Sequence, residues 1–319
     1  MTNLADRITA ESPTAESLPA VDSAAMLPGH IDTAWLGDYL LGTWADARRE
    51  SRRLMKDSAF HRDDSLGLDA QRTRVLGQLG LLVDSGSVLK AFPSALGGAD
   101  DHGANIASFE EIVTADPSLQ IKSGVQWGLF GAAVLHLGTQ RHHEKFLPGI
   151  MSLKVPGAFA MTETGHGSDV AAIGTTATYD EATQEFVIET PFRAAWKDYL
   201  GNAALHGTAA VVFAQLVTKS VNHGVHAFYM PIRDENGFLP GVGGEDDGLK
   251  GGLNGIDNGR LHFHGVRVPR ENLLNRYGDV AVDGSYSSDI QSPGRRFFTM
   301  IGTLVQARAS PNTSRLYLL

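Results

Sequence analysis

The chain has 319 residues, of which 42% are hydrophobic and 20% charged, which is ordinary for a globular protein with room for two domains. A formal net charge of -9 without clustered Lys and Arg argues against nucleic acid as a partner. The absence of cysteine excludes disulfides, cysteine-ligated metal sites and thiol nucleophiles. No apolar run approaches the roughly 20 residues of a membrane span, and the N-terminus lacks the apolar core of a signal peptide, so we expect a cytoplasmic protein.

Residues 1–30 are polar and without periodicity, which predicts a disordered leader. Residues 31–154 then predict an N-terminal helical domain. Its first helix is expected from Asp32, as N-cap, to about Lys56, and its flank of arginines is expected to be solvated. The expected buried stripe comprises Leu36, Leu40, Trp44 and Ala47, and the flank comprises Arg48, Arg49, Arg52 and Arg53.

Further helices are predicted at 69–83 and 105–113 by their apolar spacing. Asp116 followed by Pro117 is typical of an N-cap and first helical residue, and it predicts a long apolar helix reaching Leu137. The cluster from His142 to Lys145 is interpreted as a solvated helix start.

Residues 155–280 predict a middle antiparallel β-domain, because period-two segments replace the helical stripes after Pro156. Strands are expected at 175–179, 185–189, 209–217, 225–232 and 260–268, the first two forming a hairpin. Residues 281–319 are interpreted as a linker and the start of a further helix at about Arg295, which Pro311 would stop. The fold class is therefore α+β and multidomain.

The stretch "AMTETGHGSDV", residues 160–170, gathers most of the candidate chemical groups. Glu163 and His166 have a spacing that ligates metal on a helix, but the glycines at 165 and 167 disfavour a helix, so no metal site is expected. An acid/base pair and a glycine-rich phosphate loop remain open, as does a simple turn. His262 and His264 would share one strand face, and we interpret them as surface or hydrogen-bonded histidines.

Several segments together resemble the acyl-CoA oxidase branch of the acyl-CoA dehydrogenase superfamily. They are "GAFAMTETGHGSDV", "TTATYDEATQEFVIETP", "KDYLGNAALHGTAAVVFAQL", "GVHAFYMPIRD" and "DNGRLHFHGVRVPRENLLNRYGDV". The resemblance extends from about Arg48 to Ala309. It implies an N-terminal helical domain, a middle β-domain and a C-terminal helical domain, with FAD held between the last two.

The resemblance also implies site residues. Met161 and Thr162 would meet the pyrimidine edge of FAD, where Thr162 stabilises developing charge. Tyr199, Gly201 and Asn202 would form the second cofactor segment. Relatives usually have Lys-x-Trp-Ile-Thr-Asn there, and Gly201 in place of threonine is the oxidase-like pattern, which we expect to leave room for dioxygen. Gly167 and Ser168 would lie near the flavin diphosphate and the acyl-CoA entrance.

The implied reaction is α,β-dehydrogenation of a fatty acyl-CoA to trans-2-enoyl-CoA, with FAD reoxidised by dioxygen to give hydrogen peroxide. None of Glu163, Glu245 or Glu271 matches the catalytic glutamate of the family, which lies in the C-terminal helical domain, so no catalytic residue is assigned. We therefore expect a C-terminally truncated chain that does not catalyse alone, from a family of homodimers, with a complementing C-terminal fragment as a possible partner. The alternatives are a dehydrogenase using an electron-transfer flavoprotein and an inactive acyl-CoA-binding or partner-binding fragment.

Overall fold

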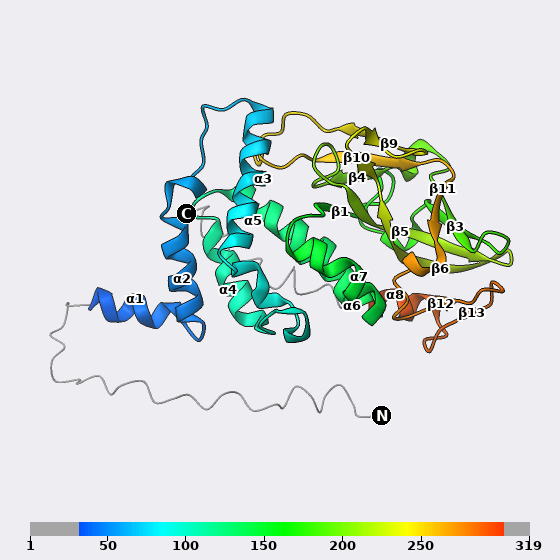
Figure 1. Ribbon diagram of the computed structural model, residues 1–319, viewed down its shortest axis with the longest axis horizontal. Helices are drawn as coiled ribbons and strands as arrows, with labels where there is room; N and C mark the ends of the chain where they lie inside the picture. The colour runs from blue at the N-terminus through cyan, green and yellow to red at the C-terminus, as the bar shows by residue number, and fades with distance from the viewer. Residues whose placement is uncertain (1–31, 303–319) are drawn as a thin grey trace. The chain divides into compact units, whose positions relative to one another are not determined.

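A computed structural model of the protein describes residues 32–302 (Figure 1). Contacts divide the chain into two compact units, residues 1–45 and 46–319. In the first unit, helix α1 (Thr33–Leu41) begins at Asp32, whose carboxylate accepts hydrogen bonds from the amides of Ala34 and Trp35. The N-cap prediction is confirmed, but the leader predicted at 1–30 lies outside the described residues.

The prediction of one helix from Asp32 to Lys56 is wrong. Helix α1 ends at Gly42, whose φ of 68° lies in the left-handed region that stops a helix, and α2 (Ala45–Met55) begins anew. The expected buried stripe is wrong too, since Leu40 and Trp44 are exposed.

In the second unit, α2 and five further helical segments of the described residues form the helical layer: α3 (Leu68–Asp84), α4 (His102–Ile112), α5 (Pro117–Ser123), α6 (Ala132–Leu137) and α7 (Gln140–Met151). Asp116 caps α5 through the amide of Ser118, with Pro117 at the first position as predicted. The predicted long helix does reach Leu137, but its middle, Gly124–Gly131, is a π-helix. Short 3₁₀ turns lie at Ser58–Phe60, Ser87–Ala91, Ser94–Leu96, Val170–Ala172, Arg193–Ala195 and Arg270–Asn272.

Two of the four arginines expected on a solvated flank form ion pairs across helices, and of these Arg52 stays exposed while Arg48 is half-buried. Arg52 Nε donates to Glu111 Oε2 at 2.7 Å, and Arg48 Nη1 donates to Glu111 Oε1 at 3.0 Å. Glu111 is buried, so both arginines stabilise its charge and join α2 to α4.

The β-domain contains two larger sheets. The first has six strands: β1 (Gly157–Ala160), β2 (Thr176–Asp180), β3 (Glu185–Glu189), β5 (Ala209–Thr218), β6 (Val221–Pro231) and β11 (Val266–Pro269). The second has three: β4 (Lys197–Leu200), β9 (Val242–Asp246) and β10 (Gly259–Phe263). Two small ladders pair β7 (Arg233–Asp234) with β8 (Gly237–Phe238) and β12 (Asp279–Val280) with β13 (Tyr286–Ser287).

The β2–β3 hairpin is confirmed, but two other expectations need correction. β5 runs parallel to β1 and to β2, so the domain is mixed rather than wholly antiparallel. The strand predicted at 260–268 is two strands, β10 and β11, which belong to different sheets. The break falls at Gly265, whose φ of 62° a continuous strand does not permit.

One apolar core joins the helical layer to the six-stranded sheet. Phe130 of the π-helix and Phe146 of α7 pack with Val211 of β5 and Tyr229 of β6, all at most 8% exposed. The rings of Phe146 and Tyr229 stack with centroids 3.7 Å apart. This core packs the helices against one face of the six-stranded sheet (Figure 1). β1, a strand at the edge of that sheet, leads into the candidate site described below.

Helix α8 (Pro293–Gly302) confirms a helix near Arg295. Residues 303–319, with Pro311, lie outside the described residues. Between residues 32 and 302, no helix combines the length and apolar character needed to cross a membrane.

Candidate functional site

The two segments singled out in the sequence lie side by side. Asp198 N donates to Thr162 O at 3.0 Å, and Thr164 N donates to Trp196 O at 2.9 Å, as in an antiparallel pair. The Thr164 hydroxyl also donates to Asp198 Oδ2 at 2.9 Å. The chain leaving β1 is thus aligned with the start of β4.

Thr162 is half-buried in this arrangement, whereas Met161 is 9% exposed. Neither the amide nor the hydroxyl of Thr162 donates a hydrogen bond to any part of the chain between residues 32 and 302. Thr162 therefore presents two donors to a ligand. Gly167 and Ser168 are exposed in the loop that follows.

Behind this segment lies an ion pair between Lys197 and Glu163, whose side chains are both 0% exposed. Lys197 Nζ donates to Glu163 Oε1 at 2.9 Å and to Met161 O at 3.2 Å. Glu163 also accepts from Thr175 N at 3.0 Å, Thr175 Oγ1 at 2.6 Å and Gly174 N at 2.6 Å. Glu163 is thus a fully bonded structural carboxylate, and no local pattern points to its partner 34 residues away.

The segment Tyr199–Asn202 holds an unusual backbone. Tyr199 and Asn202 have φ values of 63° and 69°, which are uncommon for residues with a side chain and cluster at functional sites. The Asn202 side chain is buried, and its Nδ2 donates to Gly157 O at 2.8 Å. Its Oδ1 is buried without a hydrogen-bond partner among the described residues, whereas the Tyr199 side chain is exposed.

Gly201 touches the helical layer. A β-carbon at this position would lie 2.8 Å from Val125 Cγ2 in the π-helix and 3.4 Å from Ile256 Cγ2. The contact with Val125 is closer than packed carbon atoms accept, whereas the contact with Ile256 is an ordinary one. The chain's own packing therefore favours glycine at 201.

The loop that follows, residues 203–207, is held from two sides. The Arg233 guanidinium donates to four carbonyl oxygens, those of Ala203, Ala204, Leu205 and Gly207, at 2.7–3.1 Å. Asp257 Oδ2 accepts from the amides of Leu205 and His206 at 3.0 and 2.7 Å. Arg233 and Asp257 lie 26 to 52 residues beyond this loop in the sequence, and sequence analysis did not identify either of them.

Asp257 also pairs with Lys122 of α5, and both side chains are fully buried. Burial alone would raise the pKa of Asp257, but hydrogen bonds and charge from His206 and Lys122 lower it well below its usual value. Burial lowers the pKa of Lys122. The Lys122–Asp257 pair thereby connects α5 to the loop that follows Asn202.

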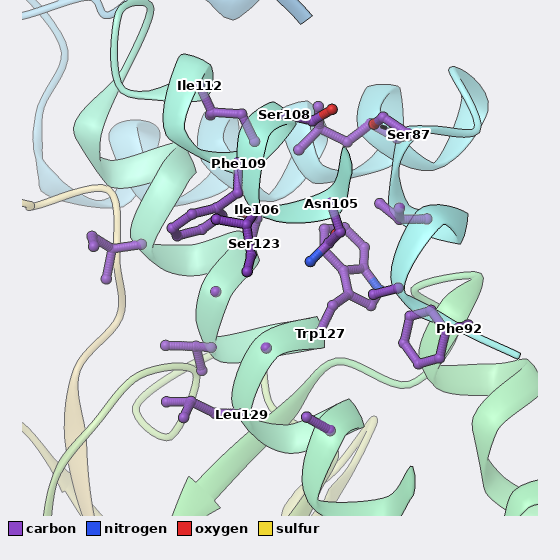
Figure 2. Close-up of a pocket in the computed structure, with 18 of the residues that line it drawn as sticks. Ser87, Phe92, Asn105, Ile106, Ser108, Phe109, Ile112, Ser123, Trp127 and Leu129 are labelled. Atoms are coloured by element: carbon purple, nitrogen blue, oxygen red, sulfur yellow. Dashed lines mark hydrogen bonds between the residues drawn. The ribbon is translucent and has the colours of Figure 1, made fainter. Parts of the chain in front are cut away.

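A cavity of about 290 Å³ lies between the helices (Figure 2). Its wall is mainly apolar, and Figure 2 shows Ile106, Phe109, Ile112 and Trp127 around it, with Asn105 as a polar group. Val125, the residue that touches Gly201, also lines it. Val125 therefore connects the cavity wall to Gly201 of the second candidate segment.

The remaining candidates have other partners. Glu245 pairs with Arg193 at the surface at 2.8 Å, and Glu271 is a surface carboxylate 3.0 Å from Arg270. No group of three or more His, Asp or Glu side chains suited to a metal occurs in the described part of the chain.

Two of the histidine expectations can be checked. His262 and His264 lie on β10 and in the turn after it, with ring centroids 5.0 Å apart, and His264 is 3.4 Å from Glu189. The expectation of a wholly solvated helix start at 142–145 is wrong for His142. Its ring is buried, with Nε2 2.9 Å from Glu271 O and Nδ1 accepting from Thr139 N at 3.0 Å.

Comparison with known proteins identifies this arrangement. Residues 48–154 match the N-terminal domain of acyl-CoA dehydrogenase, and residues 158–266 match its middle domain. Acyl-coenzyme A oxidase 3, peroxisomal, from Arabidopsis thaliana is 39% identical over 295 residues, which are 92% of this chain and 43% of that protein. Acyl-coenzyme A oxidase 2, peroxisomal, from the same plant is 49% identical over 218 residues, 66% of this chain and 32% of that protein.

Solved structures agree. Arabidopsis thaliana acyl-CoA oxidase 1 has a TM-score of 0.67 at 28% identity, covering 86% of this chain and 41% of that one. Caenorhabditis elegans acyl-CoA oxidase-2, solved with FAD, ascaroside-CoA and ATP, has a TM-score of 0.69 at 27% identity, covering 85% and 40%. The chain thus spans about a third to two fifths of the length of these relatives. It belongs to the acyl-CoA dehydrogenase family, carries its N-terminal and middle domains, and is similar over most of its length to acyl-CoA oxidases.

Proposed function

We propose that this chain forms the flavin-facing and substrate-facing walls of an acyl-CoA oxidase that acts in fatty acid β-oxidation. FAD is the cofactor and a fatty acyl-CoA the substrate. The observation that carries the proposal is the pairing of the two candidate segments, with the free donors of Thr162 on one and Gly201 against the cavity wall on the other.

The residues present suit FAD. Thr162 offers an amide and a hydroxyl, the donors that a flavin pyrimidine edge needs, and the buried Oδ1 of Asn202 is an acceptor without a protein partner among the described residues. Met161, Thr162, Tyr199, Gly201 and Asn202 are therefore our proposed cofactor residues. When bound, FAD would accept the hydride equivalent removed from the acyl chain.

The chain's other residues would bind and orient the substrate. The apolar cavity has the lining that an acyl chain requires. Gly167 and Ser168 are exposed, and we propose them for the CoA side of the entrance. Glu163, Glu245 and Glu271 each form an ion pair with a lysine or an arginine. We therefore propose that the base that removes the α-proton comes from a C-terminal helical domain like that of the relatives.

The test has two stages. The purified chain is titrated with FAD and with palmitoyl-CoA, and binding is followed by flavin fluorescence and calorimetry. A polypeptide carrying the C-terminal helical domain of a relative is then added, and peroxide is measured. Binding of both ligands, and peroxide only after addition, supports the proposal; Thr162→Ala should weaken FAD binding, while Thr183→Ala, at the exposed hairpin, should not.

Two alternatives are separated by the same assay. A dehydrogenase would bind both ligands but pass electrons to an electron-transfer flavoprotein rather than to dioxygen. An inactive fragment would bind acyl-CoA or a protein partner without FAD. The oxidase is favoured because the curated and solved relatives above are oxidases.

Partner and compartment are proposals of the same kind. We propose a homodimer, which sedimentation of the complemented protein would test. The Arabidopsis relatives are named peroxisomal, which differs from the cytoplasmic location that we expect from the sequence. Imaging of the tagged chain in its own cell would decide between the two compartments.

A further inference from the structure

We propose that the buried Lys197–Glu163 pair positions and polarises the peptide between Met161 and Thr162, and so strengthens the Thr162 N–H as a donor to the flavin. The ligand in this inference rests on the proposed function. The effect on the peptide itself does not.

The geometry follows from the planarity of the peptide bond. Met161 C=O and Thr162 N–H belong to one peptide unit, and in a trans peptide they point in opposite directions. No cis peptide bond occurs between residues 32 and 302. Since Lys197 Nζ lies 3.2 Å from Met161 O on the buried side, the Thr162 N–H points away from Lys197, where the described chain offers it no acceptor.

The charge acts in a place without water. Lys197 and Glu163 are both 0% exposed, so the field of the ammonium at the carbonyl is little screened. A carbonyl that accepts a charge-assisted hydrogen bond makes the N–H of the same peptide a stronger donor, as in a chain of hydrogen bonds.

Glu163 fixes the ammonium in position. It accepts three hydrogen bonds from Gly174 and Thr175 besides that of Lys197, so it cannot turn without breaking them. Asp198, the carboxylate next to Lys197 in the sequence, pairs with Arg260 at 3.0 Å rather than with Lys197. Glu163 is the charged group that acts on Lys197.

Both members of the pair are charged at neutral pH. Burial lowers the pKa of Lys197 to about 8, against the opposing effect of Glu163. Burial would raise the pKa of Glu163, but Lys197 and the hydrogen bonds from Thr175 and Gly174 outweigh it and lower the pKa. Raising the pH through about 8 therefore removes the ammonium charge.

The experiment follows the Thr162 amide by two-dimensional NMR of the full chain between pH 6.5 and 9.5. We expect the amide proton to move upfield with a midpoint near 8, the pKa of Lys197. A purely structural ion pair would alter stability without this shift.

The variants test the assignment. Lys197→Met alone leaves Glu163 buried and unpaired, which can unfold the protein, so the double variant Lys197→Met with Glu163→Gln removes both charges. The Thr162 shift should disappear in the double variant. It should persist in the matched double variant Lys122→Met with Asp257→Asn, which removes the other lysine that is fully buried among the described residues together with its counter-charge.

FAD binding supplies the second measurement, and we expect about a tenfold weaker affinity in the double variant, equivalent to about 1.4 kcal/mol. A Thr162 amide that does not titrate, or titrates equally in the double variant, overturns the inference even if FAD binds. Equal FAD affinity in the unmodified protein and in the double variant overturns the claim that the pair strengthens FAD binding. Failure of every form of the chain to bind FAD overturns the proposed function instead, and the amide shift then still decides what the pair does.

Discussion

His226 is buried in β6 as a neutral imidazole. Its Nδ1 lies 3.0 Å from Gly224 O and its Nε2 2.9 Å from Tyr286 OH, so the neutral ring donates to the carbonyl and accepts from the phenol. Burial lowers its pKa from 6.5 to about 4, and the nearby charge of Arg296 adds to this.

The consequence is acid sensitivity. As the pH falls from 6.5 to 4, the unfolded chain gains a proton at residue 226 that the folded chain does not, so the free energy of unfolding falls across that window. The shift is worth up to about 3 kcal/mol. Urea unfolding at pH 7 and pH 5 should therefore show a smaller loss of stability in His226→Gln than in the unmodified protein.

His264→Gln is the matched control for His226, since that ring is 60% exposed and pairs only at the surface. It should keep the full acid sensitivity. Equal pH dependence in His226→Gln and His264→Gln would contradict the assignment and direct attention to His142, which is also buried with a lowered pKa.

The contact between the β4 loop and the π-helix leads to a prediction at the scale of elements. Gly201→Ala places a methyl group 2.8 Å from Val125 Cγ2, and overpacking of this kind costs about 1–3 kcal/mol. Val125→Ala removes the obstructing methyl groups. In urea unfolding the double variant should therefore be more stable than the sum of the two single effects predicts.

The outcome distinguishes two explanations of Gly201. Strictly additive effects would mean that the contact is not the reason for glycine. Gly77→Ala is the control, because a β-carbon there meets nothing within 4 Å and alanine favours the helix α3. It should be neutral or stabilising.

Elements whose signals are local were predictable from the sequence, and elements defined by distant partners were not. The Asp116–Pro117 start of α5 and the β2–β3 hairpin depend on neighbouring residues, and both were predicted. The division of 260–268 between two sheets depends on distant partners, because β11 pairs with β3 whereas β10 pairs with β4 and β9. The break at Gly42 is local, but it depends on a left-handed glycine that the apolar spacing does not reveal.

The same distinction holds at the candidate site. Residue types and a family resemblance located Thr162 and Gly201, whose roles in FAD binding remain predictions. Glu163 was the apparent chemical group, but its function depends on Lys197, and the loop beside Asn202 depends on Arg233 and Asp257. Charge partners far apart in sequence leave no local pattern.

At the scale of the whole molecule, two ion pairs join the helices to the β-domain. Arg72 of α3, 2% exposed, donates to Asp246 of β9 at 2.6 and 2.7 Å, and Lys122 of α5 meets Asp257 in the interior. Both pairs lie in the second compact unit together with the shared apolar core. The helical and β parts should therefore unfold in one cooperative transition.

Asp257→Asn tests this cooperativity, because it leaves the Lys122 charge buried without a counter-charge. Removal of one partner from a buried pair costs about 3–5 kcal/mol, whereas Asp180→Asn at the exposed Arg267 pair should cost at most about 1 kcal/mol. Hydrogen exchange should speed up by the same factor in peptides from α3 and from β5 in Asp257→Asn, and remain nearly unchanged in Asp180→Asn. Faster exchange in α3 alone would show that the helices open independently, and the loop beside Asn202 would then lose its support from α5 while the sheet stays folded.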